Sequence, residues 1–211
     1  MDPHLPSKIR ERLLAGLPGE QAQFQMAPHY RNRVSFSGAQ LNGYRKSAVM
    51  ILLCCRNNSD WFFPLTLRQQ YAGVHSAQVS LPGGKADSCD LTLADTALRE
   101  CYEEIGLRNN IEIAGELSPL HIPVSRFIVH PFIGINHVHD FSYQSHEREV
   151  KSIIETPLQL LVDDRTAQTG EIFLPDDQIV KTPYFLVEGH KVWGATAMIL
   201  SELKAILKDV L

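Results

Sequence analysis

The chain has 211 residues and a formal net charge of −4, with 44% apolar and 21% charged residues. This length suits one domain with a well-filled core, and this charge argues against a protein that binds nucleic acid or anionic membrane non-specifically. The four cysteines include no Cys-x-x-Cys pair, which argues against a disulfide framework or a zinc site. Because no apolar stretch resembles a signal peptide or a membrane span, we expect a cytoplasmic protein.

The first third of the chain predicts an N-terminal helix and a pair of strands. Apolar residues at helical spacing predict a helix within residues 6–17, and residues 18–45 have the polar, irregular composition of a wrapping segment. A continuous apolar run predicts a central strand at 47–55, and a turn separates it from a partner strand at 61–68. Pro64 lies inside this second strand, so we expect an irregularity or a sheet edge there.

The rest of the chain alternates strands and helices without strict β-α-β order, which favours an α+β fold with a mixed sheet. The expected elements are a short strand at 77–81 that stops at 82–85, a helix at 92–105 capped by Asp90 or Thr92 and ended by Gly106, strands at 110–117 and 127–135, a strand and short helix at 150–164, strands at 170–175 and 182–194 with a turn at Glu188–Gly189, and a closing helix at 195–207.

The helical stretch ALRECYEEIGL (97–107) places Glu100, Glu103 and Glu104 in one arc of a helical wheel. Glu100 and Glu104 are like charges one turn apart near the helix C-terminus, where anions are unfavourable. A solvated face explains such a pattern, and so does a divalent cation with oxygen ligands; the helix alone leaves both interpretations open. The opposite arc, which we expect to face the core, carries Ala94, Leu98, Cys101, Tyr102 and Ile105.

A glycine pair precedes this helix in the stretch SLPGGK. Gly83 and Gly84 allow positive φ and close backbone approach, which fits a plain turn and also fits a loop lying against a phosphate or diphosphate. Asp87 and Asp90 would add two carboxylates at the mouth of this loop.

Gly84, Asp90 and residues 99–107 together resemble the Nudix box, whose usual pattern is Gly-x5-Glu-x7-Arg-Glu-U-x-Glu-Glu-x-Gly-U, with U a bulky apolar residue. Aspartate replaces the first glutamate, and one extra residue follows it. The resemblance implies a Nudix-type α/β/α sandwich with a mixed central sheet, and hydrolysis of a nucleoside diphosphate linked to another group. We expect this domain over residues 46–211, preceded by an N-terminal helix and wrapping segment over 1–45.

Residues 65–90 also resemble the extended motif of the coenzyme A pyrophosphatase branch of that family, although Ala77 and Leu81 depart from it. This implies hydrolysis of coenzyme A or a derivative to 3′,5′-ADP and 4′-phosphopantetheine. The alternatives are another nucleoside diphosphate derivative such as ADP-ribose or NADH, and a non-catalytic nucleotide-binding module. The matching positions are Arg68, His75, Gln78, Val79, Pro82, Gly83, Gly84 and Asp87.

The resemblance implies a set of site residues and Mg²⁺ or Mn²⁺ as cofactor. A surface role is the alternative for Glu149 and Arg68, and a structural role is the alternative for His75 and Gln78. The expected partner is a small nucleotide rather than nucleic acid or a membrane, and the sequence leaves a homodimer open. The implied site comprises the metal ligands Glu100, Glu104 and Glu103, the catalytic residues Glu103, Arg99 and Glu149, and the substrate-binding residues Arg68, His75, Gln78, Gly83 and Gly84.

Overall fold

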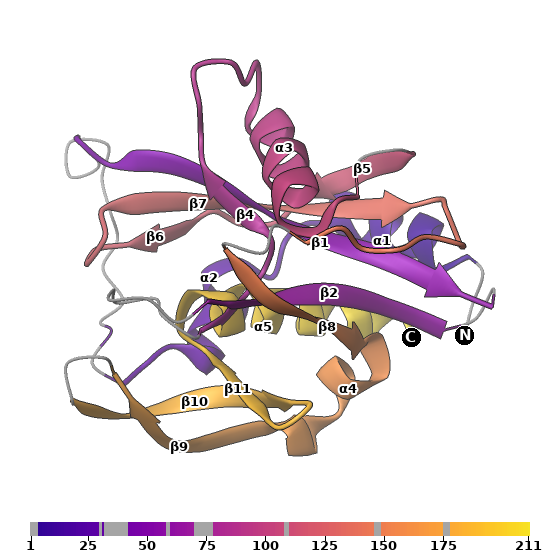
Figure 1. Ribbon diagram of the computed structural model, residues 1–211. Helices are drawn as coiled ribbons and strands as arrows, with labels where there is room; N and C mark the ends of the chain where they lie inside the picture. Colours follow the sequence, from indigo (N-terminus) through magenta and orange to yellow (C-terminus); the bar gives the residue numbers. More distant parts are fainter. Residues whose placement is uncertain are drawn as a thin grey trace.

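The computed structural model of the chain describes residues 4–29, 31, 42–57, 60–69, 78–107, 110–145, 149–174 and 178–211. Over these residues, an eight-stranded mixed sheet carries helices on both of its faces, and a separate three-stranded antiparallel sheet lies beside it (Figure 1). The expected α+β sandwich with a mixed central sheet is therefore confirmed. No helix within the described ranges combines the length and the apolar character that crossing a membrane requires.

The N-terminal segment packs against the last helix of the chain. The predicted first helix is present and ends at Leu14, a few residues earlier than expected, with Leu5 and Ile9 buried. The segment expected to be irregular contains a further short helix and a 3₁₀ turn, which contact the last helix. These elements are α1 (Leu5–Leu14), α2 (Gly19–Gln23), the 3₁₀ helix Phe24–Met26 and α5 (Gly194–Val210).

The large sheet is built around two long parallel strands, β1 and β7, which pair from Arg45 to Leu53. The strand order is β3-β2-β1-β7-β5, while β4 pairs with β1, β6 with β7 and β8 with β2. The sequence predicted neither β4 nor β6. Residues 82–85 were expected to end a strand, but part of this stretch forms β4. The strands are β1 (Arg45–Arg56), β2 (Asp60–Arg68), β3 (Val79–Ser80), β4 (Gly83–Lys85), β5 (Ile111–Glu116), β6 (Leu120–Ile122), β7 (Phe127–Asn136) and β8 (Val150–Pro157).

β1 and β2 pair only near the turn that joins them and then separate. Residues 54–56 pair with residues 60–62, after which β1 takes β4 as its neighbour and β2 takes β3. Pro64 lies where β2 has left β1, so its missing N–H interrupts no bond to that strand. Pro64 pairs in regular register with Glu155 of β8, so the structure shows the expected local edge toward β1 rather than an irregularity, and the register shift of β2 lies at Leu67 and Arg68. The divergence lets β3 and β4 enter between β1 and β2 (Figure 1).

The smaller sheet follows a short helix after β8, as the sequence predicted. Glu188 and Gly189 both adopt positive φ, the geometry of a tight hairpin turn, which confirms the turn expected there. The elements are α4 (Leu158–Val162), the 3₁₀ helix Asp164–Thr166, β9 (Ala167–Phe173), β10 (Ile179–Val187) and β11 (His190–Trp193).

The core has two parts, one on each face of the large sheet. Met50 and Leu52 of β1 face α3 (Leu93–Ile105), whereas the alternate residues Ile51 and Leu53 join the larger cluster that includes α5. Both faces of β1 are covered, which explains why this strand has a continuous apolar sequence rather than an alternating one. β1 is therefore packed on both faces, and this packing fixes the residues at its N-terminal end.

One buried carboxylate joins three separated parts of the chain. Glu202 of α5 is fully buried and accepts hydrogen bonds from the Gly19 backbone N–H at 3.0 Å and from Gln23 Nε2 at 2.9 Å. It also accepts from the Ser118 backbone N–H at 3.2 Å, in the connection between β5 and β6. Several donors converge on this carboxylate, so its removal leaves buried N–H groups without an acceptor.

We expect Glu202→Gln to lower the free energy of unfolding by about 2 kcal/mol, because an amide N–H₂ would then face donors instead of an acceptor. The measurement is chemical denaturation, with exposed Glu171→Gln on β9 as the matched control. Hydrogen exchange should show the largest loss of protection at α2. A change no larger than that of the control would contradict the anchoring role of Glu202.

Candidate active site

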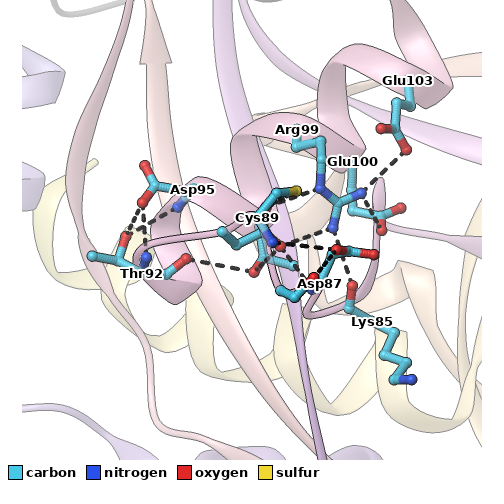
Figure 2. Close-up of polar contacts among 11 residues, drawn as sticks. Lys85, Asp87, Cys89, Thr92, Asp95, Arg99, Glu100 and Glu103 are labelled. Carbon is cyan, nitrogen blue, oxygen red and sulfur yellow. Dashed lines mark hydrogen bonds and ion pairs between the residues drawn. The ribbon is translucent and has the colours of Figure 1, made fainter.

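The helix α3 begins and ends with two well-defined caps. Thr92 Oγ1 accepts from the Asp95 N–H at 3.2 Å, and Asp95 Oδ2 accepts from the Thr92 N–H at 2.8 Å, forming a reciprocal capping box (Figure 2). Thr92 rather than Asp90 is therefore the N-cap. Gly106 ends the helix at φ 76°, as predicted, and a Cβ there would meet the Gln144 backbone N at 2.8 Å. Both caps hold the glutamates in a fixed register.

Arg99 connects the loop before α3 to the helix itself. Its guanidinium donates to both carboxylate oxygens of Asp90 at 2.9 Å and to the Lys85 carbonyl at 3.1 Å (Figure 2). It also donates to Glu100 at 2.8 Å and to Glu103 at 3.2 Å. Arg99 therefore holds four partners at once.

The Asp90 carboxylate bonds to residues of α3, which corrects the expectation that it lies at the mouth of the loop. Besides Arg99, Oδ2 accepts from Thr96 Oγ1 at 2.8 Å, and Arg99 holds the pKa of Asp90 well below its usual range. Asp87 likewise bonds within its own loop, accepting from Ser88 Oγ at 3.1 Å. Both carboxylates therefore accept hydrogen bonds from donors in or next to their own loop.

The glycine pair lies in β4 rather than in a plain loop. A Cβ at Gly83, where φ is 157°, would lie 2.4 Å from the Ala48 carbonyl of β1, so only glycine permits this approach. A Cβ at Gly84 would lie 2.4 Å from the carboxylate of Glu100. The absence of a side chain at Gly84 therefore leaves the Glu100 carboxylate against bare backbone.

Glu104 is 4% exposed, although the sequence analysis placed it in the arc opposite the core. Its carboxylate lies 3.3 Å from Thr66 Oγ1 and 3.6 Å from Arg68 Nη2, both on β2. Burial raises the pKa of Glu104 to about 7, against the opposing effect of Arg68. Tyr102, expected in the core, is 46% exposed, because the buried stripe of α3 runs through Ala97, Cys101 and Glu104 instead.

Glu100 and Glu149 extend this carboxylate group. Burial raises the pKa of Glu100, and Arg99 opposes the shift. Glu149 immediately precedes β8, whose first residue Val150 pairs with Arg68, the residue beside Glu104. The charge of Glu149 contributes to the raised pKa values of Glu100 and Glu104. Its carbonyl accepts from the Gln69 N–H at 3.0 Å, so the end of β2 fixes the start of β8.

The other expected site residues divide into three groups. Arg68 is adjacent to Glu104, whereas Gln78 contacts Arg68 through its backbone carbonyl, at 3.0 Å from the Arg68 N–H. The Glu103 side chain is 53% exposed and is directed at Arg99 rather than at Glu104. His75 lies outside the described residues.

Two hydroxyl residues near Glu104 were missed by the sequence analysis. Thr66 Oγ1 lies 3.2 Å from Ser80 Oγ, which in turn accepts from Arg68 Nε at 3.4 Å. Thr66 is fully buried, and its position as a polar residue inside an apolar strand was the available signal. These hydroxyls orient Glu104 and Arg68 relative to each other.

The carboxylates have the donor chemistry of a hard divalent cation. As the side chains lie, no three His, Cys, Asp or Glu residues of the described part of the chain are close enough together to hold a metal ion. Glu100, half-buried beside the backbone of Gly84, and Glu104, buried one turn later, nevertheless offer oxygen donors whose pKa values are raised by burial. All-oxygen ligands of this kind suit Mg²⁺ or Mn²⁺, so the residues fit such a cation.

Glu104→Gln should stabilise the metal-free protein at alkaline pH. Because the folded-state pKa of Glu104 lies above the usual 4.5, the folded protein retains a proton that the unfolded chain has lost, and stability falls as pH rises from 4.5 to above 7. In EDTA, we expect the variant to gain about 2 kcal/mol of unfolding free energy at pH 8 and much less at pH 5. Glu103→Gln is the exposed control, and equal stability of wild type and Glu104→Gln at both pH values would contradict this account.

Comparison with known proteins identifies the family. Residues 44–183 match the NUDIX domain. The chain is 30% identical over 171 residues to the mitochondrial coenzyme A diphosphatase NUDT8 of Homo sapiens, covering 80% of this chain and 72% of that protein. It is 31% identical over 169 residues to the uncharacterized Nudix hydrolase NudL of Pectobacterium atrosepticum, covering 78% and 84%.

The fold is also that of a known structure. The crystal structure of the Nudix hydrolase RenU from M. smegmatis superposes with a TM-score of 0.55 at 14% identity, covering 88% of this chain and 95% of that one. Nudix hydrolases act on small nucleotide substrates and generally use divalent metal ions. The match over most of the chain, together with the retained box glutamates, shows that this protein belongs to the Nudix hydrolase family.

Proposed function

We propose that this Nudix hydrolase cleaves the diphosphate bond of coenzyme A or a derivative, giving 3′,5′-ADP and 4′-phosphopantetheine, with Mg²⁺ or Mn²⁺ as cofactor. The observation that carries the proposal is the pair formed by the half-buried carboxylate of Glu100, which lies against the bare backbone of Gly84, and the buried carboxylate of Glu104 one helical turn later. The resemblance of residues 65–90 to the coenzyme A branch and the similarity to the human coenzyme A diphosphatase support this substrate.

Glu100 and Glu104 would hold the divalent ion, with Glu103 as a further carboxylate at the exposed edge. When bound, such an ion neutralises the diphosphate and lowers the pKa of a water molecule. Arg99 is a positioning residue, because its contact with Glu100 at 2.8 Å fixes the direction of that carboxylate. Thr66 does the same for Glu104.

Glu149 is the proposed general base, taking the proton of the attacking water on its carboxylate. Its proximity to Glu100 and Glu104 supports this role, since its charge contributes to the raised pKa of both carboxyl groups. It belongs to a different element from α3, so it can approach the substrate from another side than the metal ligands. A base on a separate segment could accept the proton of the water while Glu100 and Glu104 hold the ion.

The substrate diphosphate would lie against Gly83 and Gly84 and contact Arg68. A guanidinium binds phosphate oxygens through paired donors, and Arg68 is already directed at the site by its contact with Glu104. Gln78 would support Arg68 through its backbone carbonyl, while His75 is proposed as a substrate contact from the motif alone.

Four free cysteines agree with the proposed cytoplasmic setting, and a homodimer is a proposal that solution scattering would test.

A substrate panel tests the proposed specificity. We expect kcat/KM for coenzyme A to exceed that for ADP-ribose, NADH and a dinucleoside polyphosphate by at least roughly tenfold, a difference of about 1.4 kcal/mol in transition-state binding. Mass spectrometry should identify 3′,5′-ADP and 4′-phosphopantetheine. A clear preference for ADP-ribose would replace the proposed substrate, and absence of turnover on every compound with Mg²⁺ or Mn²⁺ would remove the catalytic assignment.

Glu149→Gln should separate the base from the metal ligands. We expect kcat to fall by roughly 10²-fold to 10⁴-fold with little change in the Mg²⁺ concentration for half-maximal activity, because the amide cannot accept the proton. Glu104→Gln should instead raise that Mg²⁺ concentration. Glu188→Gln, in the hairpin of the smaller sheet, is the control. Wild-type kcat in Glu149→Gln would assign the base to another group.

A further inference from the structure

A closed ring of polar side chains links Glu104 to Arg68 by two routes. The direct route is the ion pair between Arg68 Nη2 and Glu104 Oε1 at 3.6 Å. The indirect route starts at Arg68 Nε, which donates to Ser80 Oγ at 3.4 Å. It continues over 3.2 Å from Ser80 Oγ to Thr66 Oγ1, and Thr66 Oγ1 lies 3.3 Å from Glu104 Oε2. The ring therefore uses both carboxylate oxygens of Glu104.

The number of protons sets the direction of each bond in this ring. Arg68 Nε is only a donor, so Ser80 Oγ accepts from it and keeps its own proton available for Thr66 Oγ1. Thr66 Oγ1 lies 3.3 Å from the Ser80 carbonyl as well, but the ionised carboxylate of Glu104 is the stronger acceptor. Every bond thus points from the arginine to the carboxylate, and such a chain of donors strengthens each of its members.

The backbone of Arg68 is fixed on both sides, whereas its side chain reaches solvent. The Arg68 N–H donates to the Gln78 carbonyl at 3.0 Å, and the N–H of the next residue, Gln69, donates to the Glu149 carbonyl at 3.0 Å. β8 has one extra residue opposite Leu67 and Arg68, and a bulge of this kind directs a side chain beside a site. The Arg68 side chain is 33% exposed, so the guanidinium can turn while its Cα stays in place.

Arg68 supplies Glu104 with positive charge that a bound divalent cation would supply directly. At 3.6 Å the two atoms lie beyond ordinary hydrogen-bond distance, so this contact is an ion pair that exchanges at little cost. A divalent ion held by Glu104 would be a like charge beside the guanidinium, and like charges repel strongly where little solvent screens them. The ion and Arg68 therefore compete for the same carboxylate.

We propose that Arg68 exchanges partners: it pairs with Glu104 in the metal-free protein and turns to a phosphate oxygen of the substrate once a divalent ion is bound at Glu104. Ser80 is the positioning residue for this exchange, because its contact with Nε holds one side of the guanidinium while the Nη groups change partner. The proposal rests on the proposed function for the identity of the ion and the substrate. Arg68 becomes available to the substrate only after the ion has taken its place.

A metal titration without substrate tests the exchange. We expect Arg68→Gln to bind Mn²⁺ roughly threefold more tightly than wild type in isothermal titration calorimetry, because a competing cation in a partly exposed ion pair is removed. At saturating Mn²⁺ the same variant should raise KM for coenzyme A roughly fivefold, since a charge-assisted contact is lost. Arg165→Gln, which removes an exposed arginine–carboxylate pair elsewhere, is the matched control. Unchanged or weaker Mn²⁺ binding by Arg68→Gln would overturn the exchange.

A double-mutant cycle tests the positioning role of Ser80. At saturating Mn²⁺ we expect Ser80→Ala to raise KM for coenzyme A roughly threefold with little change in kcat, and Ser80→Thr, which keeps the hydroxyl, to restore it. In the Arg68→Gln background, Ser80→Ala should have no further effect, because it acts through that arginine. Ser7→Ala, at an exposed position of α1, is the control. Equal effects of Ser80→Ala in both backgrounds would leave Ser80 a structural role alone.

The metal titration also separates this inference from the proposed reaction. Arg68→Lys keeps the charge, so it should keep the wild-type affinity for Mn²⁺. If coenzyme A is not hydrolysed but Arg68→Gln tightens Mn²⁺ binding and Arg68→Lys does not, the competition at Glu104 stands and the proposed substrate fails. If coenzyme A is hydrolysed while Arg68→Gln binds Mn²⁺ as wild type does, the proposed function stands and the exchange fails. Absence of Mn²⁺ binding by the folded wild-type protein would contradict both.

Discussion

The Arg99 guanidinium ties the loop after β4 to α3, because it binds both oxygens of Asp90 and the Lys85 carbonyl while also contacting Glu100. Without this cation, three carboxylates would repel each other across a single helical turn. The glycine pair depends on the same contact, since Lys85 directly follows it. The Arg99 guanidinium therefore determines both the position of Glu100 against β4 and the path of the loop.

Local patterns in the sequence predicted most elements because their causes are local. The apolar run of β1, the turn at Glu188–Gly189 and the Gly106 helix end each follow from neighbouring residues. β4 could not be predicted, because its pairing depends on β1, some 35 residues earlier in the chain. The burial of Glu104 was missed for the same reason: Thr66 and Arg68, which surround it, come from a strand whose neighbours the sequence does not specify.

Burial of Glu104 links the stability of the fold to the proposed chemistry. A carboxylate with 4% exposure and a single arginine at 3.6 Å lacks enough positive charge to ionise easily. The same deficit would give a divalent cation at the proposed site a large electrostatic gain on binding, because little solvent screens the contact. A better-compensated Glu104 would make a more stable protein with a weaker attraction for the cation, a trade-off between stability and function.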